Sequence, residues 1–108
     1  MKKIVLDMDG VLADFFKEEN YMERFENEKG FFKSLAPISN NYKWVQRFID
    51  LGFDIYVLSS SPNDRADKEK KAWLKKYIPN LINEKIIFCR NGQDKADFMQ
   101  DISNAIYI

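Results

Sequence analysis

The sequence predicts an α/β fold in which a parallel sheet lies between layers of helices. Four short apolar runs alternate along the chain with longer segments of helical pattern. Such alternation favours a parallel sheet whose strands are joined by right-handed crossovers. Polar side chains follow successive runs, and the carboxyl ends of parallel strands form the crevice where such sheets bind ligands. We therefore expect a three-layer, Rossmann-like parallel sheet with a site at this edge.

The four apolar runs that predict strands cover residues 3–7, 55–58, 86–88 and 105–108. Each run is too short for a helix, and a continuous apolar run is typical of a strand buried on both faces of a parallel sheet. The lone Cys89 directly follows the third run. We interpret it as a packing residue at a strand end rather than a nucleophile.

The segments between these runs predict helices over residues 14–29, 41–51, 64–77 and 94–100. Gly30 and Gly52 follow the first two and are expected to end them, while Pro79 limits the third. Within the third helix, the charged run 68–71 is interpreted as a solvated face, because runs of charge usually face water.

Composition narrows the class of protein. A chain of 108 residues with 45% hydrophobic residues is expected to fold as one domain. Its 17 basic and 17 acidic residues give a net charge of zero, so bulk attraction to a nucleic acid polymer or a membrane is not supported. The absence of histidine removes the usual catalytic triads and most zinc sites. One cysteine excludes an internal disulfide and fits a reducing, cytoplasmic location.

The pair Asp7 and Asp9 is the strongest functional signal. It directly follows the first apolar run, and strand alternation lets both carboxylates lean toward the same space. Two carboxylates this close repel each other unless a cation or a shared proton relieves them, and Mg²⁺ is a natural partner. One acid can then attack phosphorus while the other transfers protons. Gly10 allows the sharp turn that follows, and an ordinary solvated Asp-Gly turn is the alternative.

Hydroxyl and ammonium groups follow the next two runs. Ser59 follows the second run and can hydrogen-bond a phosphate oxygen, with the backbone of Ser60 and Ser61 beside it. Lys95 follows the third run and can neutralise a phosphate and keep a carboxylate ionised. Taken singly, serines before a helix are common caps and a lysine is usually a surface charge. Their placement after successive strands favours a shared site.

The chain resembles the haloacid dehalogenase superfamily of phosphohydrolases, and its 5′(3′)-deoxyribonucleotidase branch in particular. The segment 7–15, Asp-Met-Asp-Gly-Val-Leu-Ala-Asp-Phe, is similar to the first motif of that superfamily. Segments 58–62 and 92–97 resemble the second and third motifs. Segments 30–38 and 69–77 resemble the cap segment of the branch and its helix after the second motif. The resemblance covers nearly the whole chain and keeps the order of the motifs.

This resemblance implies a Mg²⁺-dependent phosphomonoester hydrolase. Asp7 would be the nucleophile that becomes an aspartyl phosphate, and Asp9 the general acid and base, with both residues on the metal. Ser59 would bind the transferring phosphoryl group, with Ser60 as a weaker candidate because the run of serines lets the motif be aligned in two ways, one residue apart. Lys95 would bind both the phosphoryl group and Asp7.

The resemblance also divides the chain. A phosphatase core of residues 1–13 and 39–108 would be interrupted, after the first strand, by a small helical cap over residues 14–38. Its aromatic residues would form an apolar wall for a nucleobase or sugar, unless they only make the core of the cap. These candidate substrate residues are Phe15, Phe31 and Phe32.

One departure from the family concerns its fourth motif, a pair of acids after the next strand that completes the Mg²⁺ site. The chain ends at Ile108, inside the predicted fourth strand, and no such pair follows. Asp101 precedes that strand and is a poor substitute. We therefore expect a phosphatase core that is incomplete at its C-terminus.

The expected function is a nucleoside 5′-monophosphatase, which acts on a small-molecule phosphomonoester. The alternatives are a phosphatase for small sugar phosphates and a truncated remnant that binds phosphate without catalysis. A signalling receiver domain is disfavoured. Its acceptor aspartate would have to follow an internal strand, but serines follow the second apolar run of this chain, and Cys89 and Arg90 follow the third. The oligomeric state stays open, with a homodimer among the options.

Overall fold

The computed structural model describes residues 3–98 and 105–108. Its four strands form one parallel sheet in the order β3-β2-β1-β4. Their bounds are β1 Lys3–Leu6, β2 Asp54–Ser61, β3 Ile86–Arg90 and β4 Ala105–Tyr107. The predicted α/β fold with a parallel sheet is confirmed.

Strands β2 and β3 are longer than the apolar runs predict. The segment 59–61, expected to be a loop, continues β2, because Ser59, Ser60 and Ser61 pair with Phe88, Cys89 and Arg90 of β3. Hydrogen bonding between the strands therefore carries them past the point where their apolar residues end. Cys89 is buried within β3 rather than following it.

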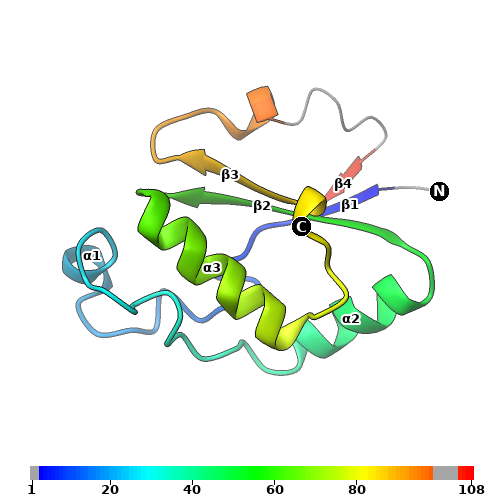
Figure 1. The fold of residues 1–108 in the computed structure, drawn as a ribbon, viewed down its shortest axis with the longest axis horizontal. Coiled ribbons are helices and arrows are strands. Elements are labelled where there is room, and N and C mark those ends of the chain that lie inside the picture. The colour runs from blue at the N-terminus through cyan, green and yellow to red at the C-terminus, as the bar shows by residue number, and fades with distance from the viewer. Residues whose placement is uncertain (1–2, 99–104) are drawn as a thin grey trace.

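The longer helices are α2, Asn41–Asp50, and α3, Asp64–Tyr77. Both lie on one side of the sheet in Figure 1, while the short 3-10 helix η2, Lys95–Phe98, lies on the other. A second 3-10 helix, η1, spans Asn83–Lys85 and precedes β3. Helix α3 has the predicted bounds, and its start is fixed by Asn63, whose side chain accepts a hydrogen bond from the backbone N–H of Ala66. The last residues of the helix predicted over 94–100, and Asp101, lie outside the described residues.

The helix predicted over residues 14–29 is wrong for most of its length. Only α1, Tyr21–Arg24, is helical there, and the rest of the segment consists of turns and bends. Asn20 adopts a left-handed backbone conformation with φ 56°, which separates α1 from the residues before it. The backbone N–H of Asp14 donates to the carbonyl of Ala36, so the segment begins by pairing with a distant stretch of chain. Tertiary contacts replace the local helical pattern.

The main hydrophobic core joins the segment 14–38 to the sheet and its helices. Phe15, Phe31 and Phe32 belong to the same buried cluster as Leu6 of β1 and Trp73 of α3. The division of the chain into a core and a helical cap therefore stays a prediction. Among the described residues, no helix is long and apolar enough to cross a membrane.

Candidate active site

A cavity of about 330 Å³ lies at the carboxyl ends of β1 and β2. One part of its wall is polar and another is aromatic. The polar residues include Asp7, Asp9, Ser60 and Lys95. Three residues predicted to act together, and the weaker of the two serine candidates, therefore line one space. The remaining lining residues are Phe15, Phe16, Tyr21, Met22, Phe25, Phe32, Pro62 and Asn91.

Asp7 lies directly after β1 and is held by two different groups. Its Oδ1 accepts a hydrogen bond of 2.8 Å from the backbone N–H of Met8. Its Oδ2 lies 3.2 Å from the ammonium nitrogen of Lys95, which comes from η2 on the other side of the sheet. Both side chains stay partly exposed, so the pair is open to a ligand in the cavity.

Asp9 is more buried than Asp7 and pairs with a residue that sequence reasoning missed. Its Oδ2 accepts a hydrogen bond of 2.9 Å from Nζ of Lys70. The interpretation of residues 68–71 as a solvated face is thus wrong for Glu69 and Lys70, which are both buried. The signal available in the sequence was the position of Lys70 on α3, three residues before Trp73 on the inner side of the helix.

Ser59 and Ser60 have different surroundings because successive residues of a strand point to opposite faces. Ser59 is fully buried, and its Oγ accepts a hydrogen bond of 2.9 Å from Lys70. Ser60 lines the cavity with Asp7, and its Oγ lies 3.5 Å from Sγ of Cys89. Ser59, the first candidate from the sequence, is therefore hydrogen-bonded to Lys70 of α3, while Ser60, the weaker candidate, faces the cavity.

Burial raises the pKa of the Asp9 carboxyl above its ordinary value. The nearby charge of Lys70 and its hydrogen bond act in the opposite direction, and the negative charge of Asp7 raises the pKa further. Asp9 therefore holds a proton to higher pH than an ordinary aspartate does. This is the condition that a general acid requires.

The aromatic wall only partly matches the predicted residues. Phe15 and Phe32 line the cavity and stack on each other, with ring centroids 5.9 Å apart and planes 8° apart. Phe31 is fully buried behind them and is not among the lining residues. Phe16 and Met22, which the sequence did not single out, line the cavity while 61% and 68% exposed. They therefore stand at its mouth.

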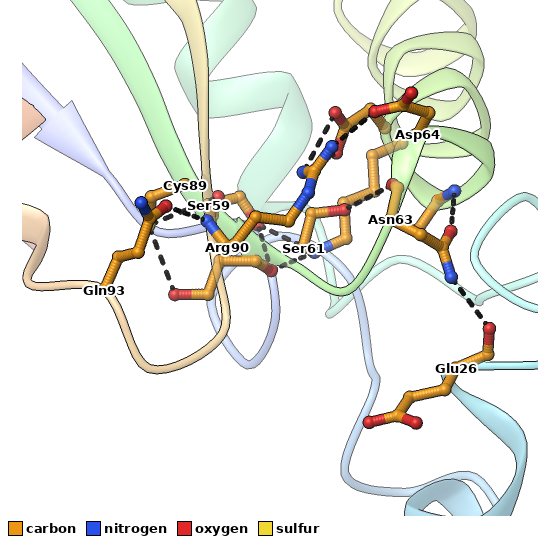
Figure 2. A network of polar contacts seen from close by, with 12 residues as sticks. Glu26, Ser59, Ser61, Asn63, Asp64, Cys89, Arg90 and Gln93 are labelled. Atoms are coloured by element: carbon orange, nitrogen blue, oxygen red, sulfur yellow. Dashed lines mark hydrogen bonds and ion pairs between the residues drawn. The ribbon is translucent and has the colours of Figure 1, made fainter.

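A polar network anchors the ends of β2 and β3 beside the site (Figure 2). Arg90 reaches the start of α3, where it contacts both carboxylate oxygens of Asp67 at 3.1 Å and Oδ1 of Asp64 at 2.5 Å. Its backbone N–H donates to the side chain of Gln93, which fixes the turn before η2. Because η2 carries Lys95, this network sets where Lys95 meets Asp7.

The donor set for a metal ion is two carboxylates. Among the residues that the structure describes, no group of three or more His, Cys, Asp or Glu side chains could hold a metal ion. Mg²⁺ commonly takes one or two protein carboxylates and completes its shell with water and phosphate oxygens. Asp9 Oδ1 is buried without a hydrogen-bond partner among the described residues, so it could still accept one. The residues present fit a Mg²⁺ ion bound together with a phosphate group.

Three comparisons relate the chain to known proteins. A family model described as 5′ nucleotidase, deoxy (Pyrimidine), cytosolic type C protein matches residues 17–106, a range that begins after the acidic motif. A search of curated proteins found no match. Among solved structures, the chain is similar to a class C acid phosphatase from Bacillus anthracis crystallised with tungstate bound. That match has a TM-score of 0.67 at 14% identity and covers 98% of this chain. The chain spans 50% of the length of that phosphatase, and the likeness shows the parallel α/β fold.

Proposed function

The chain belongs to the cytosolic type C 5′ nucleotidase family, and from this premise we propose that it hydrolyses the phosphate ester of nucleoside monophosphates. One observation carries the proposal. The cavity at the strand ends joins two acidic groups, a serine and a lysine to an aromatic wall. The polar part suits a phosphate group, and the aromatic part suits a flat, apolar nucleobase.

Asp7 is the proposed nucleophile. An oxygen of its carboxylate forms a bond to phosphorus while the bond from phosphorus to the ester oxygen breaks, which leaves an aspartyl phosphate. The contact with Lys95 at 3.2 Å supports this role, because a nearby ammonium offsets the negative charge on the phosphoryl oxygens as they approach the carboxylate. Water then attacks phosphorus while the bond from phosphorus to the Asp7 oxygen breaks, which releases inorganic phosphate and regenerates the Asp7 carboxylate.

Asp9 is the proposed general acid and base. It donates its proton to the leaving ester oxygen, and it accepts a proton from the attacking water in the second step. The raised pKa of Asp9 supports the first of these roles. The two carboxyl groups thus divide the work according to their surroundings, with the more exposed one as nucleophile.

Mg²⁺ is the proposed cofactor, held by Asp7 and Asp9. When bound, it would offset the negative charges of the carboxylates and the phosphate group as they approach each other. Of the two serines, Ser60 is proposed to contact the phosphoryl group, because it lines the cavity, whereas Ser59 acts behind it.

The proposed substrate is a small molecule, and the proposed location is the cytoplasm. The single cysteine and the cytosolic type of the family support this location. Among the candidate substrate residues, Phe15 and Phe32 are proposed to contact the nucleoside, while Phe31 supports them from the core.

The test is phosphate release from a panel of deoxynucleoside and ribonucleoside monophosphates and small sugar phosphates, with and without Mg²⁺. Asp7→Asn is the matched variant, because it keeps the shape of the side chain while removing its charge. Mg²⁺-dependent release from nucleotides that this substitution abolishes would support the proposal. Faster release from sugar phosphates would favour the sugar-phosphate alternative. No release from the folded, unaltered chain would favour a non-catalytic remnant.

A further inference from the structure

Lys70 carries a buried charge whose three hydrogen-bond donors are all used. Its side chain is 0% exposed, and Nζ donates to Asp9 Oδ2 at 2.9 Å, to Ser59 Oγ at 2.9 Å and to the carbonyl of Ser60 at 2.6 Å. An ammonium has three N–H groups, so none remains for another partner. Its nitrogen also lies 4.5 Å from the ring centroid of Phe32.

Burying a charge in this way is costly unless it is paired, and such pairs often contribute orientation more than stability. The partner that gains orientation here is Asp9. Lys70 binds Oδ2, while Oδ1 has no hydrogen-bond partner among the described residues. The carboxyl group is therefore held through one oxygen only, and Lys70 decides how it is oriented.

The two lysines at the site have separate partners and approach from opposite sides of the sheet. Lys95 comes from η2, lines the cavity and meets Asp7, so a substrate can touch it. Lys70 comes from α3 and does not line the cavity. It can act on a substrate only through the groups that it holds.

We infer that Lys70 is a positioning residue for the acid step, which fixes the carboxyl group of Asp9 through Oδ2 at the cavity that Asp9 lines. This inference rests on the proposed function, because it assigns how Asp9 is presented to the ester oxygen. It concerns the position of the proton donor and leaves phosphate binding to Ser60 and Lys95.

The dependence of the rate on the leaving group tests this role. Nucleoside monophosphates have a poor leaving group that needs a proton, whereas p-nitrophenyl phosphate has a good one that needs little help. Replacing Lys70→Met keeps the length of the side chain but frees Asp9. We expect kcat/KM for nucleoside monophosphates to fall about 100-fold or more, the usual size of acid catalysis. For p-nitrophenyl phosphate the fall should stay below about tenfold, because little protonation is lost there.

Lys71→Met is the matched control, since Lys71 is the next residue of α3 and is exposed. This substitution should leave kcat/KM unchanged for both substrates. An equal loss on both substrates in Lys70→Met would overturn the inference in favour of a structural role, and so would no loss on either. If Lys70→Met does not fold, Ser59→Ala, which removes one of the three acceptors, should show the same selective loss on a smaller scale. An equal change in kcat/KM for both substrates in Ser59→Ala would then overturn the inference.

The outcomes separate this inference from the proposed function. If the unaltered chain releases phosphate from neither class of substrate, the proposed function fails and the inference fails with it. If the unaltered chain is active and Lys70→Met matches it on both substrates, only the inference fails.

Discussion

Glu69 and Lys70 are consecutive residues of α3, yet their charged groups hold two different parts of the site. The carboxylate of Glu69 accepts hydrogen bonds from the backbone N–H groups of Gly30 at 2.9 Å and Phe32 at 3.0 Å. The ammonium of Lys70 holds Asp9. One turn of helix thus fixes the aromatic wall and the acidic pair relative to each other.

The contacts of Glu69 predict acid-sensitive stability. Burial by itself raises the pKa of Glu69, but the hydrogen bonds from Gly30, Arg65 and Phe32 outweigh it, so the net pKa is lowered. A carboxyl group with a lowered pKa in the folded state stabilises the fold above its unfolded pKa of about 4.3. That contribution is lost as the pH falls through the lower, folded pKa. Urea unfolding of the unaltered chain from pH 7 to pH 3 should therefore show a falling free energy of unfolding.

Glu69→Gln should remove most of this pH dependence and lower stability at pH 7 by about 1–3 kcal/mol, because buried backbone donors lose a charged acceptor. Glu84→Gln, at an exposed position, is the matched control and should behave like the unaltered chain. An equal slope of stability with pH in Glu69→Gln and the unaltered chain would contradict the role of Glu69.

Gly10 is expected to resist substitution for two separate reasons. Its φ of +82° lies in the left-handed region, and an added Cβ would meet Cε2 of Phe16 at 2.9 Å. Gly92 has a similar φ of +88° but nothing within 4 Å of an added Cβ. Gly92→Ala should therefore cost about 1–2 kcal/mol in the free energy of unfolding, from backbone strain alone.

Gly10→Ala should combine the same strain with displacement of Phe16 at the mouth of the cavity. We expect it to raise KM for nucleoside monophosphates, whereas Gly92→Ala should not. Chemical unfolding and steady-state kinetics of both variants measure the two effects. An unchanged KM in Gly10→Ala would show that Phe16 can yield without affecting the substrate.

Ser60 and Ser61 are neighbours on β2, but only Ser60 lines the cavity, so removing their hydroxyl groups should have unequal effects on substrate binding. Ser60→Ala should weaken substrate binding about tenfold or more, because a hydrogen bond to a charged phosphate is worth about 1.5–3 kcal/mol. Ser61→Ala is a fair comparison, since Ser61 is buried one residue further along β2 and does not line the cavity. KM values for a nucleoside monophosphate provide the measurement. A larger rise in Ser61→Ala than in Ser60→Ala would refute the assignment.

The exposed aromatic at the cavity mouth predicts substrate discrimination. Contact between a nucleobase and an aromatic ring is worth about 1–3 kcal/mol, so Phe16→Ala should raise KM for nucleoside monophosphates at least about fivefold. KM for a small sugar phosphate should not change, because it has no base to lose. Phe53→Ala, which lines a different cavity and is 42% exposed, should alter neither value. Equal effects of Phe16→Ala on both substrates would argue against a base contact.

The sequence by itself determined the sheet, the two main helices and the edge of the sheet where the candidate residues gather. Apolar runs and helical periodicity are local, and the bounds of α3 follow from Asn63 and Pro79, residues close to its ends. Because parallel strands bring their carboxyl ends to one edge, the order of Asp7, Ser59 and Lys95 along the chain predicted a shared site there. Asp7 and Lys95 do line one cavity, but Ser60 lines it in place of Ser59.

Only the tertiary structure decided which charges are buried and which serine faces the cavity. Lys70 belongs to a charged run that is ordinarily solvated, and its burial depends on Asp9, 61 residues away in the chain. The segment 14–29 has a helical pattern, yet its aromatic residues pack against one another and against distant parts of the chain. Local pattern describes what a segment prefers in isolation. Which charged groups become buried and paired depends on the residues that pack over them. Those residues are distant in the sequence, so a local pattern does not reveal them.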